Sequence, residues 1–413
     1  MLSKQGLLIT TALVSSLFFQ NASAVPSFAR QTGLACSSCH TIFPELNSFG
    51  RTFKMNGYTL TGIKQVSAKN SDAASGLQFN EIPPLSAMLV VNVTSVKPDS
   101  AVAGTDPGPR TNIALPDELS FFFAGEISPH MGSFIQITMA PAEGPGFAID
   151  NTDIRYANHA GDVTYGVTLN NSPTVQDLWN STPTWGFPFT AGAGVGAPLI
   201  ADGLGQNVAG LGAYADWGNG IYTELSLYKD TGAAFDASQT AGGRISGAAP
   251  YYRVAWNKNF DSGDYLMVGA YGMQTKLIDG VTYAGPADKY SDNAIDLQYE
   301  HNLANSNMIS VHTSYTNEKQ TLDFSGGGNP TLKSTKLDAI YHWGYHAEAM
   351  LGYAGNSGAD GAYDDTAYTA QYSYLPWQNT KFTAQYVAYN KIGGSTTNAS
   401  DANTTTLQAW LMW

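Results

Sequence analysis

Most of this chain repeats short segments in which apolar and polar side chains alternate with a period of two. In residues 251–257, Tyr252 and Val254 share one face of an extended strand, whereas Arg253 points to the other. Residues 368–374 alternate in the same way, with Tyr and Ala against Thr, Gln and Ser. Because successive side chains of a strand point to opposite faces, this pattern predicts strands with one apolar and one polar face.

We recognise about 16 such segments, enough for a closed barrel. They cover residues 85–96, 118–127, 131–140, 148–159, 162–170, 209–217, 220–228, 249–257, 263–275, 289–301, 308–319, 331–341, 345–356, 362–375, 380–389 and 404–413. Long and short connections alternate, as in outer-membrane barrels with short periplasmic turns and longer external loops. Closure removes exposed sheet edges, and an even strand number puts both chain ends on the periplasmic side. The sequence therefore predicts an all-β, antiparallel outer-membrane β-barrel over residues 81–413.

The composition is consistent with a barrel and excludes other classes. A mean hydropathy of −0.17 excludes a helical membrane protein with many spans. The 23 Tyr and 8 Trp suit the aromatic girdles of membrane barrels. With 33 Asp+Glu against 20 Lys+Arg, the chain lacks the basic balance of a nucleic-acid binder. A soluble all-β protein is the alternative, but no repeat of about 40 residues marks propeller blades.

The first 24 residues have the pattern of a secretory signal peptide. Lys4 supplies a positive start, residues 6–19 form an apolar run, and Ala22-Ser23-Ala24 fits the cleavage rule for small residues. The apolar run is shorter than the roughly 20 residues that span a bilayer, which disfavours an uncleaved anchor. We therefore expect export to the periplasm, and any membrane residence must use strands.

The only two cysteines of the chain stand in the motif Cys36-Ser37-Ser38-Cys39-His40. C-x-x-C-H is the attachment pattern of c-type haem. Two thiols one helical turn apart can form thioethers with the two vinyl groups, and the adjacent imidazole then lies under the iron. The sequence therefore predicts one covalent haem c, bound by Cys36 and Cys39, with His40 as the metal ligand.

Two other interpretations of the motif compete with haem attachment. A redox disulfide is compatible with export, but no thioredoxin-like βαβ pattern surrounds the cysteines. A zinc site would need further ligands, and the chain has no second cysteine pair. Haem attachment is the prediction that uses every residue of the motif.

The residues after the motif predict a short helix in a small c-type haem segment, residues 25–80. Phe43, Leu46, Phe49 and Phe53 recur on one helical face, and Gly57 is the expected stop. This face can cover a porphyrin or form an ordinary small core. The segment precedes the first strand and either plugs the lumen or hangs beneath it.

Other haem contacts stay open at the level of sequence. Arg51 and Lys54 lie off the apolar face and are candidates to meet the haem propionates. Met55 is the nearest thioether for the sixth iron position, and a distant histidine or water are the alternatives. The distant histidines, each better explained as a lumen or turn residue, are His130, His159, His301, His312, His342 and His346.

One predicted loop, residues 170–205, is long and rich in aromatic side chains, among them Trp179, Trp185, Phe187 and Phe189. Aromatic residues in a nominally exposed loop indicate that it folds inward, where it would constrict the lumen and touch the haem segment. Packing on the barrel rim is the equally open alternative.

A family resemblance is visible over essentially the whole mature chain. The chain resembles the fused monohaem cytochrome–porin outer-membrane proteins of iron-oxidising bacteria. The stretches that carry the resemblance are Phe28-Ala29-Arg30-Gln31-Thr32-Gly33, the haem motif, Phe43-Pro44-Glu45-Leu46, Phe49-Gly50-Arg51, Gly57-Tyr58-Thr59-Leu60, residues 171–177 and Trp185-Gly186-Phe187-Pro188.

The resemblance implies a function in electron transfer across the outer membrane. Members characterised as iron oxidases take an electron from Fe(II) at the cell surface and pass it to periplasmic carriers. It implies Cys36 and Cys39 as thioether residues, His40 as proximal ligand, and a periplasmic c-type cytochrome or copper protein as partner, with outer-membrane lipid around the barrel. The acidic balance fits a cationic donor, although acidity also serves solubility.

Two other functions use the same parts. A solute porin can carry a haem for structure or sensing, and an export conduit can send electrons to an external acceptor. Neither the redox potential nor the direction of electron flow is written in the sequence, because both depend on ligands, burial and hydrogen bonds.

Overall fold

The computed structural model describes residues 26–60, 83–96, 111–141, 146–190, 195, 197–201, 203–231, 243–280, 282, 284–358 and 364–413. The predicted signal peptide, residues 1–24, lies outside the described residues. So does the predicted boundary between haem segment and barrel near residue 80. Within the described residues, no helix is long and apolar enough to cross a membrane.

The described residues form three α-helices, three 3₁₀ turns and seventeen strands. The helices are α2 (Pro26–Thr32), α3 (Cys36–Cys39) and α4 (Ser48–Met55), and the 3₁₀ turns are η1 (Pro183–Trp185), η2 (Ala304–Ser306) and η3 (Ala399–Ala402). The strands are β1 (Leu85–Val96), β2 (Thr111–Ser128), β3 (Met131–Met139), β4 (Ala148–Ala160), β5 (Val163–Asn170), β6 (Val208–Asp216), β7 (Ile221–Asp230), β8 (Gly243–Ile245), β9 (Ala249–Asn259), β10 (Tyr265–Asp279), β11 (Asp288–Asn302), β12 (Met308–Leu322), β13 (Thr331–Trp343), β14 (Ala347–Ser357), β15 (Asp365–Trp377), β16 (Thr380–Lys391) and β17 (Thr404–Met412).

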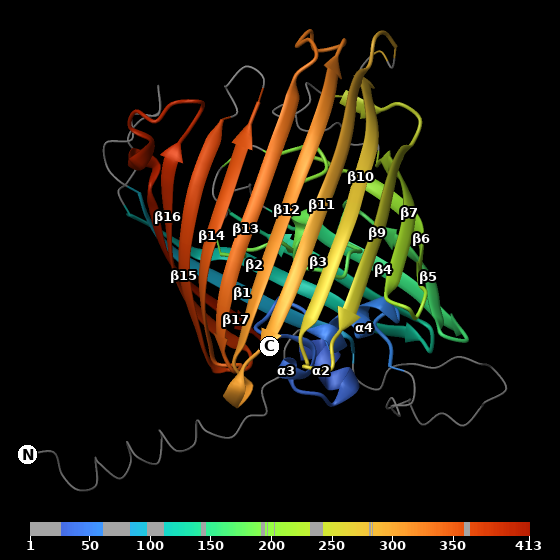
Figure 1. Ribbon diagram of the computed structural model, residues 1–413, viewed down its shortest axis with the longest axis vertical. Helices are drawn as coiled ribbons and strands as arrows, with labels where there is room; N and C mark the ends of the chain where they lie inside the picture. The colour runs from blue at the N-terminus through green and yellow to red at the C-terminus, as the bar shows by residue number, and fades with distance from the viewer. Residues whose placement is uncertain are drawn as a thin grey trace, which may run out of the picture.

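All the strands belong to one antiparallel sheet that closes on itself (Figure 1). β1 pairs with β2 along one edge and with β17 along the other, so Leu89 lies opposite both Leu119 and Leu411. β8 pairs with β10 just beyond the end of β9, so β8 and β9 act as one interrupted strand. The wall therefore counts sixteen strands, and the prediction of a closed antiparallel barrel is confirmed.

Burial in the wall is inverted relative to a water-soluble protein. On β11, Asp292, Asp296 and Glu300 point inward and are buried, whereas Ile295 points outward and is 62% exposed. The predicted faces of residues 251–257 are confirmed, because Arg253 is fully buried inside the barrel and its neighbours Tyr252 and Val254 are exposed. Such alternation suits a wall with an apolar surrounding outside and a polar interior.

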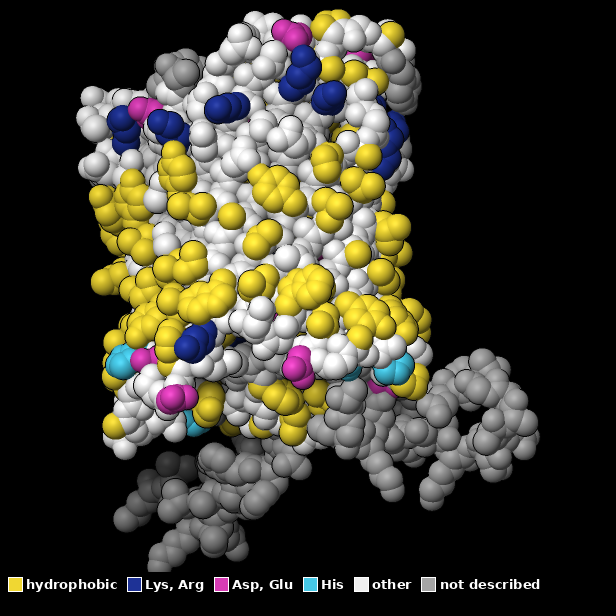
Figure 2. All heavy atoms as spheres, turned by 45° about the vertical axis from the view of Figure 1, so that its right-hand side comes forward, with side chains coloured by type: hydrophobic (Ala, Val, Ile, Leu, Met, Phe, Trp, Pro, Cys, Tyr) yellow, Lys and Arg dark blue, Asp and Glu magenta, His cyan; other side chains and the backbone are white. Residues whose placement is uncertain are grey.

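The outer surface carries an apolar belt. Figure 2 shows hydrophobic side chains in a broad band around the middle of the barrel, with charged side chains gathered above and below it. Exposed aromatic side chains also lie at or beside the short turns, namely Trp217, Phe260, Trp343, Tyr345, Trp377 and Trp413. This arrangement matches the aromatic girdle that membrane barrels place at an interface.

The two ends of the barrel differ. At one end the turns are short, as in residues 217–220 between β6 and β7, and at the other end the connections are long, as in residues 171–207 between β5 and β6. The helices α2, α3 and α4 lie at the short-turn end (Figure 1). The predicted alternation of long and short connections is therefore confirmed. The N-terminal helices lie at the mouth that has the short turns.

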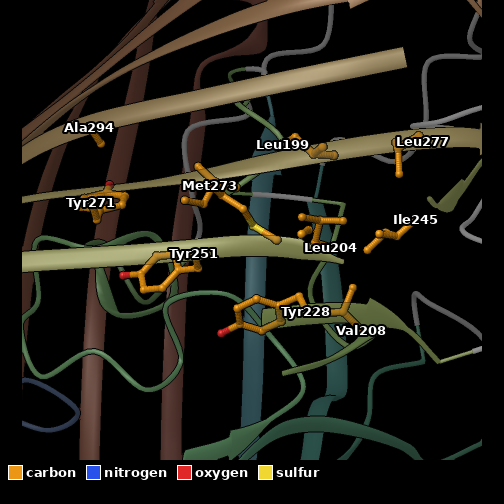
Figure 3. Close-up of a cluster of buried hydrophobic side chains, with 12 residues drawn as sticks. Leu199, Leu204, Val208, Tyr228, Ile245, Tyr251, Tyr271, Met273, Leu277 and Ala294 are labelled. Carbon is orange, nitrogen blue, oxygen red and sulfur yellow. The ribbon is translucent and has the colours of Figure 1, made fainter. Parts of the chain in front are cut away.

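Part of the lumen is filled by an apolar cluster on the side of β7 to β11. Leu199 and Leu204, from the connection between β5 and β6, pack with inward side chains that include Tyr228, Tyr251 and Met273 (Figure 3). The cluster holds the far end of that connection inside the barrel rather than on its rim.

Two details of the wall differ from the sequence prediction. β2 begins at Thr111 instead of residue 118, because Ile113 and Leu115 continue the outward alternation past Pro116, which lacks a ladder donor. The short strand β8 was absent from the prediction, since three residues carry too little periodicity to be recognised.

Candidate functional site

The predicted haem motif forms a single helical turn followed by an extended residue. Cys36 and Cys39 are the first and last residues of α3, and His40 leaves the helix with φ −120° and ψ 143°. An antiparallel bridge pairs His40 with Leu46, so the chain doubles back directly after the motif. The motif is tied to the wall as well, because the backbone N–H of Cys36 donates to Oε1 of Gln378 at 3.0 Å.

His40 is oriented through main-chain hydrogen bonds. Its Nδ1 lies 3.2 Å from the carbonyl oxygens of both Pro44 and Glu45. Carbonyl oxygens only accept, so Nδ1 carries the proton and Nε2 keeps its lone pair. Burial lowers the pKa of His40, against the smaller raising effect of these hydrogen bonds. A neutral imidazole fixed through its second nitrogen is the form that binds a metal.

The two thiols have surroundings that do not favour disulfide exchange. Neither forms a disulfide bond, and both line the same cavity as His40. Burial raises the pKa of Cys39 to about 11. Redox-active C-x-x-C pairs depend on a lowered thiol pKa, so this environment fits thioether attachment better than a redox pair.

The cavity beside the motif has a volume of about 270 Å³. Three parts of the molecule line it: the helical segment, the inner wall from β17 through β1 to β4, and the connection after β5. Aromatic side chains surround much of it, including Phe28, Phe53, Phe122, Phe134, Trp185 and Trp410. Two thiols and one oriented imidazole beside a mainly apolar cavity match the donor set and the surroundings of a covalent haem.

Gly50 allows α4 to approach the motif. A Cβ at this position would lie 2.1 Å from the carbonyl oxygen of Cys39, so any larger residue would push the helix away. Just after α4, Gly57 adopts φ +71° and its N–H donates to the carbonyl of Lys54 at 3.1 Å. Gly57 therefore ends the helix as predicted.

The predicted aromatic face is only partly correct. Phe43, Leu46 and Phe53 line the cavity, but Phe49 does not and is 40% exposed. The helix begins only at Ser48, because Pro44 interrupts the chain and the side chain of Asn47 caps the helix by accepting from the N–H of Gly50. The i, i+3 spacing before residue 48 was therefore not helical spacing.

The two predicted propionate partners have different surroundings. Arg51 is buried, donates to Glu300 of β11 at 2.5 Å and lies over the ring of Tyr265. It does not line the cavity. Lys54 does line it, and its Nζ donates to the carbonyls of Val175 and Asp177, each at 2.7 Å.

The candidates for a sixth iron ligand are also separated by the structure. Met55 packs against the cluster of Leu178 and Trp179 instead of lining the cavity. None of the other histidines lines the described part of the cavity. Two sulfur donors do line it, Met88 and Met412, which lie opposite each other on β1 and β17. Sequence reasoning missed this pair, because only the closure of the barrel brings the two residues together.

A buried charged cluster anchors the helical segment, residues 26–60, to the opposite wall. The carboxylate of Glu45 lies 3.1 Å from Nε2 of His312 and 3.5 Å from Nε2 of His342. Burial would raise the pKa of Glu45, but the imidazoles and Arg51 lower it overall. On the far side, His312 contacts Asp338 at 2.7 Å. The two histidines are therefore lumen residues as predicted, and their partner Glu45 belongs to the helical segment.

Further contacts seat the segment in the barrel mouth. The hydroxyl of Tyr58 donates to Asp153 at 2.7 Å, and Nζ of Lys381 donates to the carbonyl of Phe43 at 2.9 Å. All these side chains are buried. These contacts hold the helical segment against inward-facing wall residues at the short-turn mouth of the barrel.

The connection between β5 and β6 folds into the lumen. We call its residues 171–190 the inward loop. Val175, Gln176 and Asp177 are fully buried, and Asn180 accepts from the N–H of Leu46 at 3.3 Å. The expectation that this loop folds inward is confirmed, and it contacts the helical segment. Within the part of the chain that the structure describes, no group of three or more His, Cys, Asp or Glu is arranged to hold a metal ion by itself.

Comparisons with known proteins support the fold. No protein-family model matches the chain, and no curated protein matches it. Among solved structures, the outer membrane channel DcaP of Acinetobacter baumannii matches with a TM-score of 0.52 and 13% identity, over 80% of this chain and 96% of that one. The anion-selective porin from Comamonas acidovorans matches with a TM-score of 0.48 and 16% identity, over 79% and 98%.

OmpF of Salmonella typhi, in a complex with daunomycin, matches with a TM-score of 0.49 and 12% identity, over 80% of this chain and 97% of that one. At such identities the likeness to DcaP speaks for the fold alone. This chain has the fold of a porin-like outer-membrane barrel.

Proposed function

We propose that this protein is an outer-membrane cytochrome that carries electrons through a plugged barrel, with Fe(II) as the external donor and a periplasmic c-type cytochrome or copper protein as the acceptor. The observation that carries the proposal is the cavity inside the barrel mouth. It is lined by Cys36, Cys39 and His40, the two thiols and the imidazole that attach and ligate one covalent haem c.

The chain's own residues have defined roles in this proposal. Cys36 and Cys39 would attach the haem, and His40 would offer Nε2 to the iron, since its Nδ1–H donates to the carbonyl oxygens of Pro44 and Glu45. Aromatic side chains of the lining would shield part of the haem from water. The bound haem supplies an iron that gains and loses one electron.

The reaction needs no tight iron-binding site. One electron leaves Fe(II), which remains outside as Fe(III), and one electron reduces the periplasmic carrier. The barrel keeps the redox centre out of the lipid, and the segment that holds it faces the short-turn mouth. Because the turns at that mouth are short, we place it on the periplasmic side.

A solute porin with a structural or sensory haem is the second candidate. The fold likeness to the channel DcaP favours it. The lumen argues against it, because the haem segment and the inward loop both occupy the interior with buried contacts. An electron-export conduit shares every part of the first proposal and differs only in direction, which the redox potential decides.

Haem attachment is tested first. A pyridine haemochrome assay and a reduced-minus-oxidised spectrum of outer-membrane fractions should show one covalent haem that changes redox state. Colourless protein with two titratable thiols would end the proposal.

Stopped-flow mixing of the oxidised protein with Fe(II) then tests the donor. The haem spectrum should change to the reduced form. A haem that stays oxidised contradicts iron oxidation, and a haem that is reduced only by the periplasmic carrier favours export.

Planar lipid bilayers separate the porin from the conduit. The plugged barrel should give no large steady current. A stable open pore in the intact protein would favour solute diffusion.

A further inference from the structure

A second cavity lies on the other side of the inward loop. It has a volume of about 290 Å³ and is lined by residues 183–189, excluding Trp185, and by residues of β13, β14 and β15. No residue of the helical segment 26–60 lines it. We call it the outer chamber, because the inward loop separates it from the haem segment.

The partition between the outer chamber and the haem cavity is thin. Thr184 and Phe189 line both cavities. The ring of Phe189 packs against that of Phe187 at 4.4 Å, and Phe187 in turn stacks on His312 at 5.6 Å. A solute in the chamber is therefore separated from the haem cavity by a single layer of side chains.

The wall of the chamber carries both charge signs. Lys336 and Asp338 are inward neighbours on β13, and Thr369 adds a hydroxyl from β15. Six water molecules occupy roughly 180 Å³ at liquid density, so the chamber has room for a metal ion with its complete hydration shell. Outer-sphere transfer leaves that shell intact, and the lining needs no set of metal ligands.

We propose that the outer chamber is where the donor, a hydrated divalent cation, comes within one side-chain layer of the haem, and that Lys336 sets the charge preference of this approach. The inference rests on the proposed function and deepens it by naming the route of the donor. The positive charge of Lys336 should repel a cation that approaches through the chamber and attract an anion, because charges act on approaching ions across such a cavity.

The first experiment compares two lysines of the same strand. Lys336→Gln removes the charge inside the chamber, whereas Lys333→Gln removes one from an exposed position of β13. At low ionic strength, Lys336→Gln should speed haem reduction by aqueous Fe(II) roughly three- to fivefold and slow reduction by the anionic Fe(II)–EDTA complex by a similar factor. Lys333→Gln should change neither rate, and high salt should erase the effect.

The second experiment does not depend on haem reduction. In the protein with its haem attached, a nitroxide is placed inside the chamber through Thr369→Cys and on the lipid-facing surface through Tyr368→Cys, where the side chain is 51% exposed. Redox-inert hydrated Ni(II), added to protein in vesicles, should relax the label at position 369 and leave the label at position 368 nearly unaffected.

The outcomes separate this inference from the proposed function. Equal rates for wild type and Lys336→Gln, or a label at position 369 that Ni(II) does not reach, overturn the chamber as the donor route even if Fe(II) reduces the haem. A label that Ni(II) relaxes, in a protein whose haem Fe(II) does not reduce, keeps the chamber as a cation-accessible site and refutes iron as the donor.

Discussion

The wall of the barrel and the two segments inside it, the helical segment 26–60 and the inward loop, bury their residues by different rules. In the wall, position decides: on β7, Leu225 and Leu227 face outward while Glu224 and Ser226 face inward. In the inner segments, a charged side chain is buried where another element supplies a partner of opposite charge, as for Arg51 and Glu45. The wall therefore repeats one alternating pattern, whereas the two inner segments are held by individual pairs of residues.

The largest expected effect is the loss of covalent haem from the interior without any effect on folding of the wall. In the double variant Cys36→Ala/Cys39→Ala, covalent haem should be lost entirely, because no thiol remains to form a thioether. The barrel should still fold, since neither cysteine belongs to a wall strand. Absorbance of the purified protein reports the haem, and heat-modifiable mobility on gels reports the barrel. If the variant barrel fails to fold, the two regions are not independent.

The sequence was informative about the wall for a physical reason. A strand between an apolar surrounding and a polar lumen must alternate, so sixteen segments each carry the same local signal. Errors arose where that signal was interrupted, at Pro116 within β2 and at the three-residue strand β8. The strand order followed from the same pattern, because neighbours in sequence pair throughout an antiparallel barrel.

The interior was predictable only where chemistry is written in adjacent residues. The motif from Cys36 to His40 needs no distant partner to be recognised. The contacts that hold the motif in the barrel involve distant residues. Arg51 donates to Glu300 and Lys381 donates to the carbonyl of Phe43, and the partners of each pair are hundreds of residues apart in the chain. In the local sequence, Glu300 and Lys381 look like any other inward polar residues of the wall. The prediction for Phe49 was wrong because the chain before Ser48 is not helical.

The next effect in size tests how strongly one partner holds the plug. Glu300→Gln leaves the Arg51 guanidinium buried without its carboxylate, which should weaken seating of the helical segment by about 3–5 kcal/mol. Proteolysis of residues 26–60 in the folded barrel should become faster, and urea titration in vesicles gives the free energy. Lys289→Gln is the matched control: its pair with Asp323 is exposed at 3.9 Å, where the expected loss is about 0–1 kcal/mol. Equal losses in both variants would mean that the Arg51 pair does not anchor the segment.

A smaller effect concerns the wall's contribution to the haem. Of the sulfur donors, Met88 and Met412 line the cavity and Met55 does not. If either of the two ligates the iron, Met88→Leu/Met412→Leu should abolish the thioether-to-iron charge-transfer band and lower the redox potential. Met55→Leu should leave the spectrum unchanged. These swaps nearly conserve volume, so the fold should lose less than about 1.5 kcal/mol per site. An unchanged spectrum in the double variant would place a different group at the sixth position.

The smallest expected effect is a pH dependence within the interior that the wall does not share. Burial, together with the nearby Arg155 guanidinium, lowers the pKa of Lys54 from 10.5 to about 7. Between pH 7 and 10.5, Lys54 is protonated in the released segment but not in the seated segment. The free energy that holds the segment in the barrel should therefore increase as the pH rises from 7 towards 10.5. Below pH 7, Lys54 is protonated in both states, so its contribution is constant and the segment is held least strongly. Proteolysis of residues 26–60 should therefore be slower at pH 9 than at pH 6. Lys54→Met should flatten this dependence, because the uncharged side chain keeps the packing against Trp185 without a titrating group. A variant with the same pH profile as the wild type would assign the dependence to another buried group, and the seating of the plug would then not depend on the charge state of Lys54.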